Sequence, residues 1–105
     1  MAQAAAESGM GLEYATAVMT LLWDGGTDSW HEGAHLSDAC AAAGLDFAAL
    51  DARADNDAGE LDAAIEGNQQ AQRAAGHWGV PLMVFEDETF YGQDRFDLLC
   101  WRMAQ

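Results

Sequence analysis

The chain has 105 residues, of which 50% are hydrophobic, and carries a formal net charge of −14 at pH 7. This length suits one domain, and 18 acidic residues against four arginines and no lysine argue against nucleic acid as a partner, because phosphates would be repelled. There is no run of eighteen apolar residues and no basic leader followed by an apolar one. We therefore predict no membrane partner and a cytoplasmic location.

The first part of the chain carries the periodicity of an amphipathic helix. From Met10 onward, apolar residues recur with the i, i+3, i+4, i+7, i+8 spacing, and Gly25 and Gly26 interrupt the pattern. The stripe consists of Tyr14, Ala17, Val18, Leu21 and Leu22. We therefore predict a first helix that stops at Gly25.

A second helix is predicted from a capping-box pattern. Ser29 is followed three residues later by Glu32, so the serine oxygen can accept from the N3 amide while the glutamate reaches back to the amide of the cap. Gly44 supplies the left-handed exit. The predicted inner face consists of Leu36, Ala39, Cys40 and Ala43.

Two further helices are predicted before the period changes. Asp46 can cap a short third helix, and Asn56 or Asp57 can begin a fourth that Gly76 ends. Gly67 lies inside the fourth helix, where glycine costs about 1 kcal/mol relative to alanine. The stripe of the fourth helix consists of Leu61, Ala64, Ile65, Asn68, Ala71 and Ala75.

The last third of the chain reads as a β-hairpin followed by a helix. Residues 82–85 are an apolar run, residues 86–88 are acidic and turn-forming, and residues 89–91 favour a strand. The final helix carries Phe96, Leu99, Cys100 and Met103 on one face and Leu98 and Trp101 on a second. The fold class is α+β and mostly helical: a helical region over residues 1–76, then a loop, hairpin and helix over residues 77–105, in one compact domain.

The predicted hairpin lacks neighbours. A lone two-stranded hairpin is marginally stable in water, yet residues 82–85 are apolar at every position, as in a strand covered on both faces. The missing strands could come from a second copy of the chain, from a partner, or from a longer polypeptide.

The cysteines and histidines do not form a recognisable site. Cys40 and Cys100 lie far apart in sequence and within apolar helical patterns, so we expect both to pack as small hydrophobic residues. His31 and His35 are one helical turn apart, but two ligands do not make a metal site and the His-Glu-x-x-His pattern is absent. We predict no metal.

Two motifs in the last third resemble a known family. Gly79-Val80-Pro81 before the first strand, and the run from Phe90 to Phe96 with Gly92-Gln93-Asp94-Arg95 at its centre, look like the C-terminal end of the 2-hydroxychromene-2-carboxylate isomerase and kappa-class glutathione transferase group. That group lies within the DsbA-like thioredoxin superfamily. The Leu-Trp-Asp at residues 22–24 and the Ala-Gly-Leu-Asp at residues 43–46 resemble the helical insertion of the same family.

The resemblance implies a glutathione site. Pro81 would be the cis-proline of the superfamily, and Val80 would present its backbone N–H and C=O to the cysteinyl part of glutathione. Gln93 and Asp94 would hold the γ-glutamyl end, Asp94 through the ammonium group and the start of the last helix through the carboxylate.

Two aromatic residues complete the implied site. Trp78 and Tyr91 would border the substrate, and His77 is a further candidate for that border. Without the resemblance, Pro81 would be an ordinary proline at the start of a strand, and Asp94 an acid that stabilises a helix start.

The resemblance also implies that part of the family fold is absent from this chain. In the family, a strand-helix-strand half precedes the helical insertion and carries the catalytic serine, or the Cys-x-x-Cys of the disulfide oxidoreductases. The present chain corresponds to the helical insertion, the hairpin and the last helix, so the resemblance implies a partial thioredoxin fold without a catalytic residue.

Three hypotheses for function follow. The first is a truncated relative of a glutathione-dependent 2-hydroxychromene-2-carboxylate isomerase, inactive alone, that keeps part of the glutathione pocket and pairs with the missing half. The second is a non-enzymatic homodimeric structural or interaction protein, in which the hairpin edge or an exposed helical face meets its copy. The third is a fragment of a DsbA-type thiol-disulfide oxidoreductase. Whether the chain is an enzyme stays open.

Overall fold

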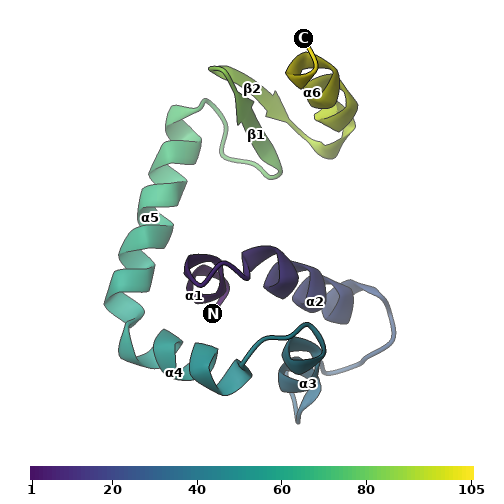
Figure 1. The fold of residues 1–105 in the computed structure, drawn as a ribbon, viewed down its shortest axis with the longest axis vertical. Coiled ribbons are helices and arrows are strands. Elements are labelled where there is room, and N and C mark those ends of the chain that lie inside the picture. The colour runs from purple at the N-terminus through teal and green to yellow at the C-terminus, as the bar shows by residue number, and fades with distance from the viewer. The chain divides into compact units, whose positions relative to one another are not determined.

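The computed structural model describes all 105 residues as a mostly helical α+β fold (Figure 1). It divides into two compact units, Met1–Ala63 and Ala64–Gln105, which are described separately. The elements in chain order are α1 (Ala2–Glu7), α2 (Gly11–Trp23), α3 (His35–Ala42), α4 (Phe47–Asn56), α5 (Ala58–Ala74), β1 (Leu82–Phe85), β2 (Glu88–Tyr91), a 3₁₀ turn η1 (Gln93–Arg95) and α6 (Phe96–Met103). The predicted mostly helical α+β class is confirmed, whereas the partial thioredoxin fold and the division at residue 76 stay predictions.

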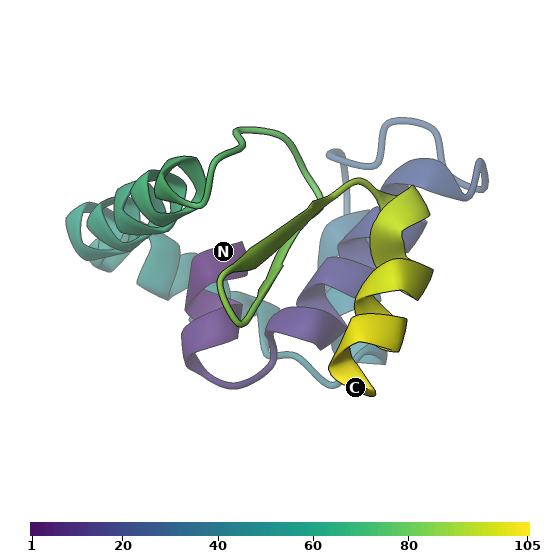
Figure 2. The ribbon, with the colours of Figure 1, turned by 90° about the horizontal axis from the view of Figure 1, so that it is seen from above.

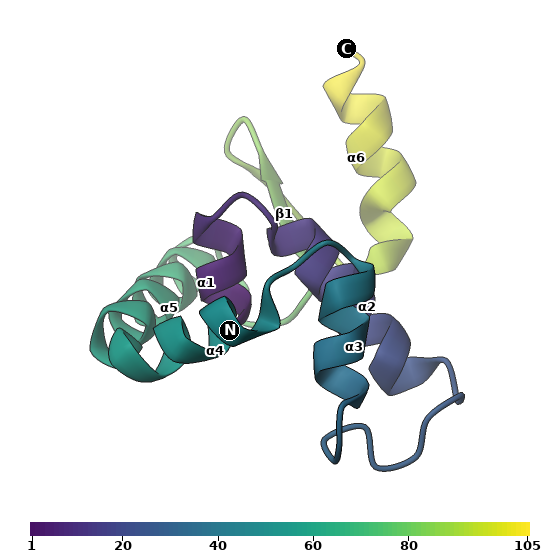
Figure 3. The ribbon, with the colours of Figure 1, turned by 60° about the horizontal axis from the view of Figure 1, so that its bottom comes forward.

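The first unit is a cluster of helices around a small aliphatic core. Helix α1 packs against α2 and α4, and α3 packs against α2 and α4 (Figure 3). Helices α1 and α2 approach closely, since a Cβ placed on Gly11 would lie 3.0 Å from the Cα of Ala6. The buried residues of this core are Ala4, Ala5, Cys40, Leu45, Leu50 and Leu61.

The capping box predicted at Ser29 is wrong. Helix α3 begins at His35 with Ala34 as its N-cap, and no side chain caps it. Ser29 has a φ of 52°, outside the extended region that an N-cap residue adopts, and its carbonyl instead accepts from the N–H of Glu32 in a tight turn. The segment that the capping pattern assigned to the start of a helix is therefore a loop.

The cap predicted at Asp46 is confirmed. Its Oδ1 accepts a hydrogen bond of 3.0 Å from the N–H of Ala49, at the start of α4. Helix α5 runs unbroken through Gly67, so the cost of that glycine does not interrupt it. Of the stripe predicted on this helix only Leu61 is buried, and Ile65 is 41% exposed.

The second unit consists of the end of α5, the hairpin and α6. Strands β1 and β2 are antiparallel, with Phe85 paired to Glu88 across a two-residue turn of Glu86 and Asp87, both at positive φ. Positive φ at both central residues matches the right-handed twist of the strands. The hairpin turn is therefore one residue shorter than predicted, because Glu88 belongs to β2.

Helix α6 follows the hairpin and contacts β1 (Figure 2). Phe90 of β2 and Leu99 of α6 are the buried hydrophobic residues of this unit. Arg102 crosses from α6 to the hairpin turn: its guanidinium lies 5.5 Å from the centre of the Phe85 ring and donates to Glu88 at 2.8 Å. Stacking of Arg102 on an aromatic ring and its charge-assisted hydrogen bond together fix α6 against the strands.

Much of the apolar surface of the second unit is exposed. Val84, in the strand expected to be covered on both faces, is 54% exposed. On α6, the predicted inner face contributes only Leu99 to the core. The exposed apolar residues of that helix are Phe96, Leu98, Cys100, Trp101 and Met103.

The two cysteines differ in environment. Cys40 is fully buried in the first unit, as predicted, whereas Cys100 is exposed on α6, so its predicted burial is wrong; both are free thiols. No helix is both long and apolar enough to cross a membrane.

Thiol labelling tests this difference in burial. Burial raises the pKa of the Cys40 thiol, which lowers its thiolate fraction as well as its access to reagent. We expect a chromogenic disulfide reagent to modify one thiol quickly in the native protein and the second only after addition of denaturant. In Cys100→Ser the fast phase should disappear. Two fast thiols in the native protein would contradict the described core.

An acid titration tests the ion pair that ties α1 to α4. The hydrogen bonds from Gln3 and Arg53 lower the pKa of Glu7 from its ordinary 4.5. The stability that Glu7 contributes is therefore present above pH 4.5 and lost as the pH falls through the lowered pKa. We expect denaturant unfolding of Glu7→Gln to lose less stability below pH 4.5 than the parent protein does. Glu13→Gln, which removes a carboxylate that makes no ion pair, should follow the parent.

Candidate functional site

The residues predicted for the site gather at one end of the hairpin. Val80 and Pro81 lead into β1, and Gln93 and Asp94 follow β2. The Gly92 N–H donates a 3.0 Å hydrogen bond to the Pro81 carbonyl, immediately beyond the paired strand ends. The peptide bond between Val80 and Pro81 is cis, as the resemblance implies.

The Asp94 carboxylate lies close to Gly92, the residue between β2 and η1. Gly92 has a φ of 95°, and a Cβ placed there would lie only 2.5 Å from Asp94 Oδ1, so glycine leaves room for the carboxylate. The Arg95 N–H donates to the Gly92 carbonyl at 3.1 Å, and Arg95 Nε lies 3.9 Å from Asp94 Oδ2. The turn therefore holds the Asp94 carboxylate close to Gly92, the residue that is hydrogen-bonded to Pro81.

Three stacked rings form what we call the aromatic shelf: His77 and Trp78 from the loop before β1, and Tyr91 from the end of β2. The His77 ring stacks on Tyr91 with centroids 3.6 Å apart and on Trp78 with centroids 5.6 Å apart. Trp78 is 81% exposed and Tyr91 46% exposed. The two residues predicted to border a substrate thus lie together, joined by the imidazole of His77.

Gly79 packs closely against the His77 and Tyr91 rings of the shelf, a role that sequence reasoning missed. Its N–H donates to His77 Nδ1 at 2.7 Å, and its carbonyl accepts from Gln72 Nε2 at 2.6 Å. His77 Nδ1 therefore acts as an acceptor, which places the imidazole proton on Nε2 in the neutral ring. A Cβ on Gly79 would lie 2.6 Å from Tyr91 Cε2, so only glycine fits beneath the rings.

The main chain of Val80 is open to ligands. The residue is 79% exposed, and neither its N–H nor its carbonyl takes part in a hydrogen bond within the chain. An exposed peptide unit next to a strand can pair with an extended peptide as a further strand would.

A hollow that Tyr91 also lines adjoins the aromatic shelf. It is lined by Thr89, Phe90, Tyr91, Arg95 and Leu98 and has a volume of about 420 Å³. Arg95 brings one of the four cations of the chain to it, beside aromatic and aliphatic walls. Such a lining suits a ligand with an apolar body and an anionic group.

No metal site is evident in this unit or elsewhere. The structure contains no group of three or more His, Cys, Asp or Glu side chains arranged to hold a metal ion. The groups available at the site are the Val80 peptide unit, the Asp94 carboxylate, the Gln93 amide and the aromatic shelf, which bind and orient a ligand rather than attack it.

Comparison with known families gives the arrangement a context. A family model described as a DSBA-like thioredoxin domain matches residues 1–104. The chain belongs to this family. Comparison of the chain with curated proteins and with solved structures found no match. Membership of the DSBA-like thioredoxin family was predicted from the Gly-Val-Pro and Gly-Gln-Asp-Arg motifs, and that part of the prediction is confirmed.

Replacing Gly79 tests whether the shelf depends on close packing. Gly79→Ala would force the new methyl group against the Tyr91 and His77 rings, and we expect a loss of about 1–3 kcal/mol in the free energy of unfolding. The ring stack should loosen, which a change in tyrosine and tryptophan near-UV circular dichroism would report.

Gly67→Ala is the matched control. A Cβ at Gly67 meets nothing within 4 Å, and the residue lies inside α5. Alanine should therefore stabilise the protein by roughly 0.5–1 kcal/mol without changing the near-UV spectrum. Equal effects of the two substitutions would contradict the described packing at Gly79.

Proposed function

We propose that this chain is a glutathione-binding relative of the 2-hydroxychromene-2-carboxylate isomerases, which keeps part of the glutathione pocket and does not catalyse the reaction alone. The observation that carries the proposal is the 79% exposed residue Val80, whose peptide groups make no hydrogen bond within the chain, at the same end of the hairpin as Asp94. A tripeptide thiol presents both a backbone that can pair with Val80 and an ammonium group that suits Asp94.

The charges of glutathione fit the two ends of the site. Its γ-glutamyl part carries an ammonium group and a carboxylate close together. Asp94 offers the counter-ion for the ammonium group, and the N–H groups at the start of η1 and α6 favour the carboxylate. Gln93, in the first turn, is positioned to hydrogen-bond the same end of the ligand.

The aromatic shelf is the place that we propose for the second substrate. With glutathione along Val80, the exposed rings of Trp78 and Tyr91 would flank its sulfur side. Rings stacked in this way present a flat apolar surface to a planar organic substrate. The exposed Trp78 would then contribute to substrate binding and not to glutathione affinity.

Catalysis would require residues outside this chain. The site holds no nucleophile next to a base, and Cys40 lies buried in the first unit. The exposed apolar residues on β1 and α6 suit coverage by the strand-helix-strand half of the family fold, supplied by another segment or protein. Activity is therefore expected only when that half is present.

A calorimetric titration with reduced glutathione tests the proposal. Asp94→Asn removes the counter-ion of the ammonium group, and we expect the dissociation constant to rise by about tenfold, in line with a charge-assisted hydrogen bond. Asp97→Asn is the matched control, since Asp97 is the acid in the first turn of α6, as Asp94 is in η1, but lies outside the predicted site. Its affinity should stay within about twofold of the parent.

Two results would count against the proposal. Equal affinities of Asp94→Asn and Asp97→Asn would remove Asp94 from the site. Absence of glutathione binding, both to the chain alone and to the chain mixed with the N-terminal half of an isomerase of this family, would overturn glutathione as the ligand.

The disulfide oxidoreductase alternative has the same family membership behind it. It requires a Cys-x-x-Cys, and the two cysteines of this chain are free, one buried and one exposed. Under this alternative the dithiol would also come from a separate N-terminal half. A mixture with that half that reduces disulfides but does not bind glutathione would favour it.

A further inference from the structure

Gly79 is held on both sides by hydrogen bonds to side chains. Its N–H donates to Nδ1 of His77 at 2.7 Å, and its carbonyl accepts from Nε2 of Gln72 at 2.6 Å. Gln72 lies in the last turn of α5, and all three residues belong to the second unit. Glycine has the widest freedom of main-chain rotation, so these two hydrogen bonds restrict a residue that would otherwise adopt many orientations.

The same hydrogen bonds set the direction of the Val80 N–H. The carbonyl of Gly79 and the N–H of Val80 belong to one peptide unit, which is trans. In a trans peptide unit these two groups point to opposite sides. Because the carbonyl is directed at Gln72, the Val80 N–H is directed away from it, and it makes no hydrogen bond within the chain. The conformation of Gly79 therefore determines how Val80 presents this donor to a ligand.

His77 can accept the Gly79 hydrogen bond only while its ring is neutral. A neutral imidazole has one nitrogen that accepts, whereas both nitrogens of the charged ring carry a proton. Protonation of Nδ1 would place two donors 2.7 Å apart and remove this hydrogen bond. Histidine is the side chain that ordinarily changes its charge between pH 5 and 8. One of the two restraints on Gly79 is therefore sensitive to pH.

The groups around His77 do not replace the hydrogen bond that its charged form loses. The titratable group in contact with its ring is Tyr91 of β2, and phenols are uncharged in this pH range. The acids of the adjoining elements, Glu88 of β2 and Asp94 of η1, pair with arginines and not with His77. Arg73, in the last turn of α5, is a cation and cannot stabilise a charged ring. Protonation therefore leaves Gly79 without this restraint and gives His77 no ion pair in return.

We propose that His77 is a positioning residue of the glutathione site, whose neutral ring acts through Gly79 to hold the Val80 N–H in the orientation that binds the ligand. Protonation of His77 releases Gly79, so the site binds glutathione more weakly on acidification. This proposal rests on the proposed function, because glutathione is the ligand that pairs with Val80 there.

Calorimetric titration with reduced glutathione between about pH 5 and about pH 7.5 tests the proposal. Glutathione does not change its own charge in this range, since carboxyl groups ordinarily titrate below it and amino groups and thiols above it. We expect the dissociation constant of the parent protein to be about fivefold higher at the acidic end, which corresponds to the loss of one hydrogen bond.

Two substitutions of His77 separate its acceptor from its ring. In His77→Asn, Oδ1 can accept from the N–H two residues on, as in an Asx turn, but it does not titrate. This variant should bind within about twofold of the parent at pH 7.5 and lose the pH dependence. His77→Phe keeps a ring on Tyr91 without an acceptor, so its dissociation constant should be about fivefold higher at every pH. A residue that acted through ring stacking alone would give the reverse order.

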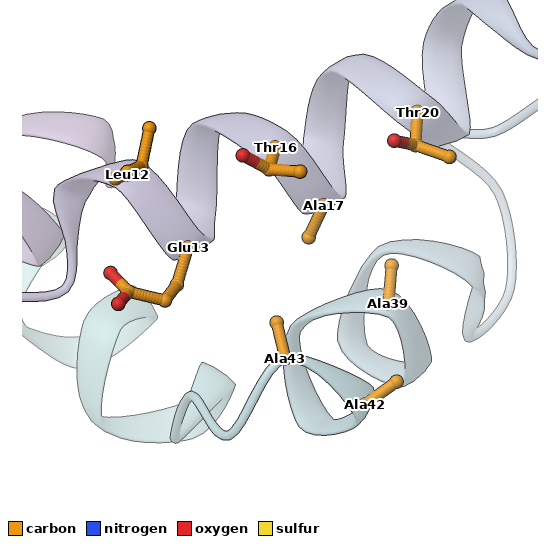
Figure 4. Close-up of a pocket in the computed structure, with 8 residues that line it drawn as sticks. All are labelled: Leu12, Glu13, Thr16, Ala17, Thr20, Ala39, Ala42 and Ala43. Carbon is orange, nitrogen blue, oxygen red and sulfur yellow. The ribbon is translucent and has the colours of Figure 1, made fainter.

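Glu13→Gln is the control for the place of binding. A hollow of about 600 Å³ is lined by residues of α2 and α3, and Figure 4 shows the Glu13 side chain beside the alanines and threonines of this lining. Its carboxylate is another group that could attract the ammonium group of glutathione. Glu13→Gln should stay within about twofold of the parent at every pH. A loss of affinity in Glu13→Gln but not in His77→Phe would place the ligand in the first unit and overturn the proposal.

Two further outcomes would overturn the proposal and leave the proposed function standing. One is binding by the parent protein that does not change with pH, and the other is a His77→Asn variant that keeps the pH dependence of the parent. Absence of binding at every pH would overturn the proposed function and, with it, glutathione as the ligand that His77 controls.

An NMR titration without ligand tests the restraint by itself. The amide signals of Gly79 and Val80 should shift together with the His77 ring signals in the parent protein and stay constant in His77→Asn. Amide signals that do not follow the His77 ring would overturn the role of His77, whether or not glutathione binds.

Discussion

The hydrogen bond from the Gly92 N–H to the Pro81 carbonyl is the contact on which the second unit depends. It closes the hairpin at the end opposite the Glu86-Asp87 turn and so fixes the segment before β1 against the segment after β2. Because strand pairing allows one register once the turn is set, the segments that hold Val80 and Asp94 are brought to the same end of the hairpin although thirteen residues separate the two along the chain. The aromatic shelf follows from the same closure, since Tyr91 ends β2 and His77 precedes β1.

A second constraint is that the chain contains many more apolar residues than its cores bury. Half of the residues are hydrophobic, but the buried hydrophobic set is small and consists mostly of alanine, cysteine and leucine. The large side chains are on the surface: Trp23 and Trp78 are at least 80% exposed. Exposed apolar area of this kind is typical of surfaces that contact another protein or another segment of a chain.

Sequence patterns predict correctly the features that depend on neighbouring residues, and they fail for features that depend on how distant segments pack. The Asp46 cap was predicted correctly because its carboxylate needs only the Ala49 amide three residues on. The capping box at Ser29 has an equally good pattern, but the loop takes the serine to positive φ and the helix starts six residues later. Cys40 and Cys100 have similar apolar neighbours in sequence, yet only Cys40 finds helices packed around it.

The sequence by itself determined the order of the elements from α2 to α6, apart from η1, together with the hairpin and the membership of the DSBA-like thioredoxin family, since these depend on periodicity, turn residues and short motifs. Only the tertiary structure placed Gly79 under the His77 and Tyr91 rings and left the main chain of Val80 unpaired. It also decided that the face of α2 with Leu12 and Trp23 points outward. Helical spacing predicts which residues share a face; which neighbour covers that face depends on how the other elements pack.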